Sequence, residues 1–404
     1  MAGITITGLA QVLKRQYAKT LTELCRYDEG MFKRLKKLSD YRATGSGYYF
    51  SLMVGDDQQA IGAAAEDSTL QDPDVFTAIQ GYVVCVYQYA TFRITGPAVA
   101  RAQNGGGFFS DALGYDIKKK RQLLARYLDE QFVRNGDGVC ATCVGSGSSA
   151  TSMIVDTTRH LHRNMKIEVY TTAGAAEITS VDITRINPQT KTLTLEDAGS
   201  WTDGSYIYRD GQYNSGTPLE MTGLRQMIDD ETTATYQNIT VASYPEYMSY
   251  VDSDGGAISR ERLFKANNYA ELFSPGTIQE NWQNRALRNK LFMIIQPAII
   301  FQKPANLELA YNPKDDVLSF ENKSFPVDET IFDGDMFGMN WSTIGKIEEK
   351  PIGIESIIPG EGSTMLRDSG KDAATGFLST YVQPVCTNRR GNYKFTGLTT
   401  DYTF

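Results

Sequence analysis

The stretch "FFSDALGYDIKKKRQLLARYLDEQFVRNGDG" (residues 108–138) carries the strongest helix signal in the chain. Its apolar residues recur at spacings of four, seven and four along one stripe, which is typical of a helix that packs one face on a core: Leu113, Ile117, Leu124 and Leu128. Ser110 is a candidate N-cap, Arg134 falls in the last turn, and Gly136 stands where a left-handed C-cap is common. The pattern predicts a helix over residues 110–135, about 37 Å long at ~1.5 Å per residue.

The residues that follow this helix contain a possible metal or redox motif. Cys140 and Cys143 form a C-x-x-C, and after sixteen intervening residues come His160 and His162, the only histidines in the chain. This order resembles a zinc site in outline, but the H-x-H spacing departs from the usual three to five residues. A redox dithiol is disfavoured because such a motif opens a helix, whereas this one follows a helix. We therefore predict a helix stop followed by a strand, with both cysteines acting as small buried apolar residues and no metal bound.

The other candidate sites lack residues that their motifs require. The glycine-rich stretches "NGGGFFSD" and "VGSGSSAT" lack the Lys-Ser/Thr of a phosphate-binding loop. "VDSDGG" (251–256) begins like a calcium loop, but Ala257 and Leu263 stand where glycine and glutamate are needed. No nucleophile motif lies near either histidine. The sequence predicts no catalytic, cofactor-binding or metal-binding residue and no cofactor.

Composition places the chain among globular proteins made in a reducing compartment. A chain of 404 residues is long for one core, and five thinly spread cysteines do not suggest a disulfide framework. No secretory signal is visible at the N-terminus. The most apolar run, "LFMIIQPAIIF" (291–301), is far shorter than the ~20 residues that span a bilayer. We expect no membrane association.

Charge is distributed unevenly along the chain. Residues 1–43 carry nine Lys/Arg against four Asp/Glu, a net charge of +5, although the whole chain carries −8. The same segment has apolar residues at helical spacing: Leu9, Val12, Leu13, Tyr17, Leu21 and Leu24. We expect this arm to dock on an acidic surface of its own kind rather than to bind nucleic acid.

Residues 44–95 predict a long hairpin. A short strand leads into residues 55–72, which hold five Asp/Glu and no Lys or Arg, and the β-rich run 75–95 could extend about 70 Å as one strand. A hairpin of only two strands is barely stable in water, so we expect it to pack against a neighbouring subunit.

Further along the chain, residues 164–213 predict a small module of alternating strands. Helices are expected from Ser259 onward and over 275–293, around Trp282 and Leu287.

This order of elements resembles the major capsid proteins of tailed bacteriophages, the Hong Kong 97-type fold. The resemblance covers essentially the whole chain, and its most particular pieces are "VRNGDG", "FENKSFPVDETIFDGDMFGMN" and "CTNRRGNYKFTGL". It implies an α+β fold with these parts: an N-terminal arm 1–43, an E-loop 44–95, a P-domain 96–163 with spine helix 110–135, an inserted β domain 164–213, an A-domain 214–340, and a return through both domains over 341–404.

The resemblance also implies a function, which is assembly rather than catalysis. The expected protein forms the icosahedral shell of a tailed phage from hexamers and pentamers of itself, in the host cytoplasm, and encloses double-stranded DNA without reading its sequence. A separate scaffolding protein, a portal and a decoration protein are the expected partners. Two alternatives remain: an encapsulin-type compartment, which shares the fold, and a zinc enzyme using Cys140, Cys143, His160 and His162.

Overall fold

The computed structural model describes most of the chain in two compact units. The described residues are 30–38, 43–44, 47–56, 61–64, 66–70, 72, 75–97, 108–213, 219–230, 235–274, 276–302, 319–321, 323–353 and 366–400. The first unit comprises residues 1–34, 85–129 and 348–382, and the second comprises 35–84, 130–347 and 383–404. The helical face expected over residues 9–24 lies outside the described residues.

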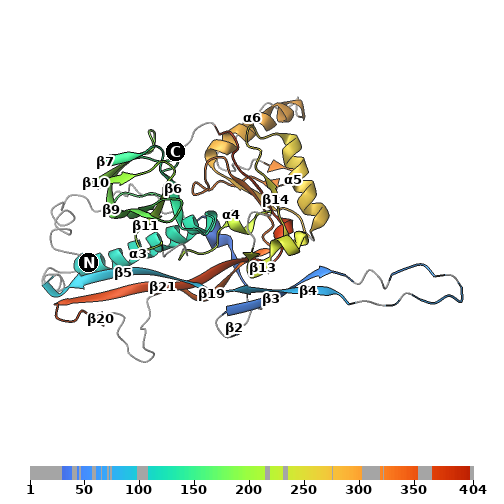
Figure 1. Cartoon of the computed structure of the whole chain (residues 1–404), viewed down its shortest axis with the longest axis horizontal. Coiled ribbons are helices and arrows are strands. Elements are labelled where there is room, and N and C mark those ends of the chain that lie inside the picture. Colours follow the sequence, from blue (N-terminus) through green and yellow to red (C-terminus); the bar gives the residue numbers. More distant parts are fainter. Residues whose placement is uncertain are drawn as a thin grey trace. The chain divides into compact units, whose positions relative to one another are not determined.

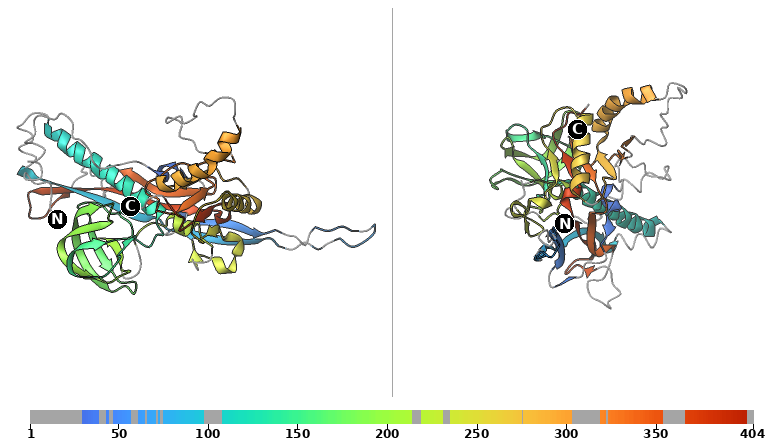
Figure 2. Two further views of the ribbon diagram at one scale, coloured as in Figure 1. Left: turned by 90° about the horizontal axis from the view of Figure 1, so that it is seen from above. Right: turned by 90° about the vertical axis from the view of Figure 1, so that its right-hand side faces the viewer.

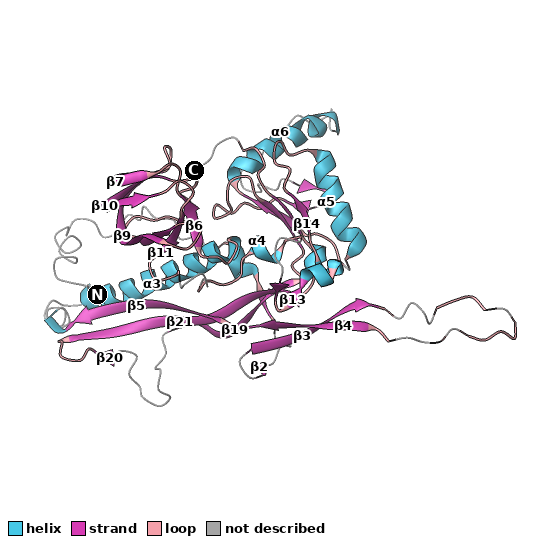
Figure 3. Cartoon of the chain, in the orientation of Figure 1, coloured by secondary structure: helices cyan, strands magenta, loops and turns pink. Residues whose placement is uncertain are grey.

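The first unit is a long antiparallel sheet covered by one helix. β5 (Val86–Thr95) pairs along its whole length with β21 (Ala373–Cys386), and β20 (Leu366–Arg367) pairs on the other side of β21. Figure 3 shows β5 and β21 side by side, with the helix α3 (Phe108–Val133) running along them. Leu124 and Tyr127 of α3 pack on Leu378, against which Ala90 and Ile352 also lie. The sheet therefore gives the helix its apolar partner.

The expected spine helix is confirmed, with both ends shifted. α3 begins two residues before Ser110 and ends at Val133, so Arg134 lies just beyond it rather than in its last turn. Leu124 and Leu128 are buried, in agreement with the predicted stripe, and Gly136 has a left-handed φ of 79°. The helix stop was correctly placed because a glycine tolerates this backbone conformation without strain.

The second unit contains a small barrel. Its six strands follow the order β6-β11-β8-β9-β10-β7 and are β6 (Val139–Thr142), β7 (Gly147–Ile154), β8 (Lys166–Tyr170), β9 (Ala176–Asn187), β10 (Thr192–Trp201) and β11 (Tyr206–Arg209). A bridge between Cys143 and Val155, and the hydrogen bond from Val144 N to Ile154 O (2.8 Å), join the two outer strands. Figure 2 shows the closed ring of strands in green. The module of alternating strands is thus larger than 164–213, because β6 and β7 belong to the same sheet.

The second unit also contains a larger mixed sheet with two helices. Its order is β14-β22-β18-β15-β17-β16, built from β14 (Tyr250–Asp252), β22 (Tyr393–Phe395), β18 (Met336–Met339), β15 (Glu280–Gln283), β17 (Lys323–Ser324) and β16 (Ser319–Phe320). α5 (Arg260–Phe273) begins as expected at Ser259, whose hydroxyl accepts a hydrogen bond from Arg262 N. The helix expected over 275–293 was wrong in its first half: Trp282 lies in β15, and α6 spans Arg285–Gln302. Among the helices of the described residues, none combines the length and apolar character needed to cross a bilayer.

The hairpin of the second unit is shorter than expected. β3 (Gly47–Gly55) pairs with β4 (Thr77–Val83), and β2 (Ala43–Thr44) pairs on the outer side of β3 (Figure 1). The run 75–95 is not one strand but two, since β4 and β5 are separated at Val84 and Cys85 and belong to different sheets. At the hairpin base, Tyr82 N donates to Gln237 O (2.9 Å), so this end is supported by its own chain.

The remaining elements of the second unit are short. β1 (Lys36–Lys37) pairs in parallel with the beginning of β19 (Ile344–Gly353), and β12 (Thr235–Tyr236) pairs with β13 (Ile239–Thr240). α4 (Leu224–Met227) is a single turn with two buried residues. The mixed helix and sheet content confirms the expected α+β class.

Candidate functional site

The two cysteines of the C-x-x-C lie in the barrel core. Cys140 and Cys143 are 0% and 1% exposed, and both belong to a cluster of buried apolar residues. The Sγ of Cys143 contacts the Met153 Sδ at 3.7 Å. Burial raises the pKa of the Cys140 thiol to about 11 and that of the Cys143 thiol to about 12. Both groups are therefore protonated near neutrality, which suits packing better than nucleophilic or metal chemistry.

His160 has a different environment and a fixed tautomer. Arg134 Nε donates to its Nδ1 (3.2 Å), so the ring proton lies on Nε2, which donates to the carbonyl of Thr330 (2.7 Å). Burial first, and the charge of Arg134 second, lower the pKa of His160 to about 3. The neutral imidazole thus links the end of α3 to the loop that carries Thr330.

His162 is bound to the helix by a carboxylate. Its Nε2 lies 2.7 Å from Glu130 Oε1, and the Glu130 side chain is almost fully buried. Burial alone would raise the pKa of Glu130, but the hydrogen bond with His162 and nearby positive charges lower it to about 2. The two histidines therefore have separate partners, and neither faces a cysteine in any contact that the structure records.

The centre of this region is a buried ion pair. Arg134 Nη1 donates to both carboxylate oxygens of Glu220, at 2.7 and 3.0 Å, and both side chains are at most 1% exposed. Glu130 Oε2 lies 3.6 Å from the same guanidinium. The sequence did not reveal this arrangement, because Glu220 is 86 residues from Arg134 and no local pattern joins them. Arg134 anchors the helix end instead of facing solvent.

The zinc hypothesis finds no geometric support in the described residues. No group of three or more His, Cys, Asp or Glu side chains among them is arranged to hold a metal ion. The four residues are close together in sequence. In the structure, however, Cys140 and Cys143 belong to the barrel core, whereas His160 and His162 belong to the network around Arg134. The four residues do not form the tetrahedral set that zinc needs.

We predict that the purified protein contains no stoichiometric zinc, because its thiols are buried and its histidines are already hydrogen-bonded. Elemental analysis after dialysis measures this directly. About one zinc per chain would overturn the prediction, and the paired replacement of Cys140 and Cys143 by serine would then have to release the metal.

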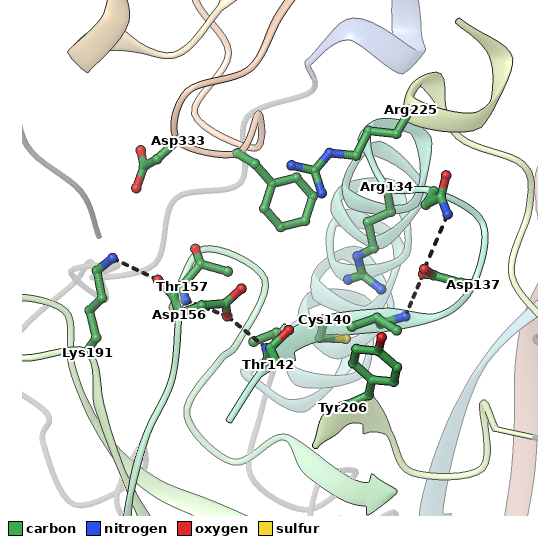
Figure 4. A pocket seen from close by; sticks show the side chains of 14 residues that line it. Arg134, Asp137, Cys140, Thr142, Asp156, Thr157, Lys191, Tyr206, Arg225 and Asp333 are labelled. Carbon is green, nitrogen blue, oxygen red and sulfur yellow. Dashed lines mark hydrogen bonds between the residues drawn. The ribbon is translucent and has the colours of Figure 1, made fainter. Parts of the chain in front are cut away.

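A cavity of about 450 Å³ opens beside the helix end (Figure 4). Its charged lining groups are already engaged: Lys191 Nζ donates to Asp156 O (2.7 Å), and Arg225 Nε pairs with Asp335 (2.6 Å). Asp137 accepts a hydrogen bond from Val139 N (3.0 Å), so its carboxylate shapes the turn after the helix. The cavity contains no activated nucleophile and no recognisable cation site.

The most unusual surface is the outer part of the hairpin. Apolar side chains are exposed at the outer end of β3 and in the segments beyond the paired strands: Met53, Ile61, Leu70, Val75 and Phe76. Phe50, Ile79 and Val83, nearer the base, are buried. An exposed apolar hairpin of this kind is typical of a surface that another chain covers. A second exposed aromatic pair, Tyr87 and Tyr89 of β5, contacts Tyr381 on β21.

Comparison with solved structures identifies the fold. The cyanophage A-1(L) capsid protein matches with a TM-score of 0.59 at 10% identity, covering 98% of this chain and 100% of that one. Mycobacterium phage Bobi gives a TM-score of 0.48 at 8% identity, with 99% and 100% coverage. The SrpI encapsulin from Synechococcus elongatus PCC 7942 gives 0.46 at 7% identity, with 97% of each chain covered. No family model and no curated protein matches the sequence.

The class of fold follows from these observations. The spine-like helix on a long antiparallel sheet, the exposed hairpin and the full-length match to the cyanophage capsid protein define a Hong Kong 97-type capsid fold. The expected fold is confirmed, and the barrel is an addition within it.

Proposed function

We propose that this protein is the major capsid protein of a tailed bacteriophage, a structural and non-catalytic shell subunit. The observation that carries the proposal is the match of fold over 98% of the chain to the cyanophage A-1(L) capsid protein. The exposed apolar hairpin supports it, since this surface would be buried only in an assembly. We prefer a capsid function to a zinc-dependent enzyme function because no group of metal-binding side chains is formed in the described part of the chain.

The proposed mechanism is assembly through many weak contacts. A single hairpin contact contributes little, but repetition around pentamers and hexamers makes a closed shell stable. The proposed partners are other copies of this chain, together with a scaffolding protein, a portal and a decoration protein. The shell would form in the host cytoplasm and enclose double-stranded DNA without sequence-specific contacts, in keeping with the net charge of −8. Protein cargo in place of DNA in purified shells would favour the encapsulin alternative.

A substitution on the hairpin tests the proposal. Phe76 is 59% exposed in the subunit, so Phe76→Asp should leave folding unchanged while placing a charge in the assembled contact. Velocity sedimentation should show large particles for the unaltered protein and slowly sedimenting subunits for the variant. Gln189→Asp, at an exposed polar position outside the hairpin, in the turn between β9 and β10, is the control and should leave assembly intact. Unaltered protein that never forms particles, or Phe76→Asp particles indistinguishable from them, would contradict the proposal.

Covalent cross-links between subunits are expected to be absent. Some proteins that this chain resembles join an E-loop lysine to an asparagine of a neighbour. Between Ala43 and Ile117 this chain has no lysine, and its only basic residues there are Arg93 and Arg101, so the nucleophile is missing. Particles boiled in detergent should run as one band at 44.8 kDa. A ladder of multimers would refute this.

A further inference from the structure

An asparagine and a lysine share one carboxylate oxygen in the larger sheet of the second unit. Asn267 Nδ2 of α5 donates to Glu321 Oε2 at 3.0 Å, and Lys323 Nζ of β17 donates to the same oxygen at 3.3 Å. A second carboxylate, Glu271 Oε1, lies 2.8 Å from the lysine. The lysine amine, the asparagine amide and a bridging carboxylate are thus brought together from two elements more than 50 residues apart in sequence.

The burial of these side chains is unusual for their types. Asn267 is 0% exposed in the middle of a helix, where asparagine is a poor helix former, and Lys323 is 6% exposed. Glu321 keeps its side chain about one-third exposed and adopts a left-handed φ of 53°, which is rare outside glycine. Residues held in such backbone conformations cluster at functional positions. The apolar residues Leu263, Ala266 and Phe325 belong to the surrounding core cluster.

The amide carbonyl of Asn267 faces a hydrogen-bond donor. Tyr393 Oη lies 3.0 Å from Asn267 Oδ1 and 2.6 Å from Asn281 Oδ1, but a hydroxyl has only one proton to donate. Asn281 Nδ2 is buried without a hydrogen-bond partner. Turning the Asn281 amide over lets its Nδ2 donate to the hydroxyl and directs the tyrosine proton to Asn267 Oδ1. Burial raises the pKa of Tyr393, so the phenol stays protonated and can polarise this carbonyl.

We propose that Lys323 and Asn267 form an intramolecular amide bond in the folded chain. Glu321 takes a proton from the Lys323 ammonium, and the neutral amine attacks Cγ of Asn267. The carbonyl oxygen gains negative charge next to the Tyr393 hydroxyl. The bond from Cγ to Nδ2 then breaks as Glu321 passes one proton to the leaving nitrogen and takes one from the attacking nitrogen, so one ammonia departs and the new amide keeps a single N–H. No oxidant, metal or further reactant is needed.

Each group has a role that the geometry supports. Glu321 contacts both the nitrogen that must lose a proton and the nitrogen that must gain one, which is what a general acid–base requires. Glu271 forms a second ion pair with the lysine, and Tyr393 stabilises developing charge on oxygen. Packing in the core keeps the reacting groups together and replaces a collision by a local step. The bond lies within one chain, so it creates no ladder of multimers and does not depend on the proposed capsid function.

Mass spectrometry of the intact, denatured protein tests the proposal. The purified chain should be lighter than its sequence by one ammonia, and protease digestion should yield a branched peptide joining Asn267 to Lys323. Lys323→Arg keeps the positive charge but removes the amine nucleophile, and it should have its full sequence mass. Glu321→Gln should also retain the ammonia, or lose it at least tenfold more slowly. Circular dichroism of both variants verifies that they fold.

Two controls separate this bond from other losses of ammonia. Asn268→Ala changes the exposed neighbour of Asn267 and should leave the mass loss intact. The Asn-Gly pairs at 104–105 and 135–136 can lose ammonia by cyclising on their own backbone, but that loss would persist in Lys323→Arg. Full sequence mass in the unaltered protein, or a mass loss unchanged by Lys323→Arg, would overturn the proposal.

Discussion

Replacing Glu220 by alanine should destabilise the folded subunit by about 3–5 kcal/mol, the usual cost of leaving one member of a buried ion pair without its partner. Arg134 and Glu220 are joined by two hydrogen bonds and are almost completely buried, so water cannot replace the lost carboxylate. The weaker contact with Glu130 at 3.6 Å does not neutralise the guanidinium alone, since Glu130 is also bound to His162. Urea unfolding followed by circular dichroism measures the free energy.

A double variant distinguishes the ion pair from general damage to this region. Arg134→Met combined with Glu220→Leu removes both charges and fills a similar volume, so it should recover a large part of the stability lost in Glu220→Ala. A loss below about 1 kcal/mol in the single variant would mean that solvent reaches Arg134. A double variant as unstable as the single one would mean that the hydrogen bond from Arg134 to His160 is the dominant contact.

Assembly should protect the outer hairpin from amide exchange by orders of magnitude. In the subunit, residues 51–56 and 75–78 have no buried side chain, and the backbone of residues 51–55 pairs with that of residues 77–80 in a two-stranded ribbon. A two-stranded ribbon of this kind opens readily, so exchange should take seconds to minutes in free subunits. In particles, a covering neighbour would slow exchange in the same residues. Hydrogen-exchange mass spectrometry of both forms makes the comparison.

The hairpin base provides the internal control for that experiment. Residues 79, 81 and 83 are buried, and Tyr82 N is hydrogen-bonded to Gln237 O within the same unit. This part should be protected in free subunits and particles alike. Equal protection of the outer hairpin in both forms would show that assembly does not cover it, and the proposed subunit contact would then be wrong.

Local signals in the sequence predicted the spine helix and the small β module well. The apolar stripe through Leu124 and Leu128 and the glycine at 136 are features of one short segment, so they could be recognised without tertiary information. The helix start was misplaced because Ser110 fits an N-cap pattern but lies inside α3. The module was underestimated because β6 and β7 join it through pairing with β11 and β10, which are distant in sequence.

Other errors arose where tertiary pairing decides the structure. The run 75–95 carries no glycine or proline between β4 and β5, so nothing local marks the break at Val84 and Cys85. Trp282 was assigned to a helix, but its backbone pairs with Phe337 in the larger sheet. The Arg134–Glu220 pair and the Asn267–Glu321–Lys323 cluster join residues separated by 50 or more positions, and neither has a motif that a sequence pattern could reveal.

Electron microscopy of the purified, concentrated protein tests the central claim most directly. The account predicts closed or partly closed shells built from rings of five and six copies, with the β3–β4 hairpin of each subunit lying on a neighbour. A preparation that contains only folded monomers or small oligomers under every condition that preserves the fold would contradict it.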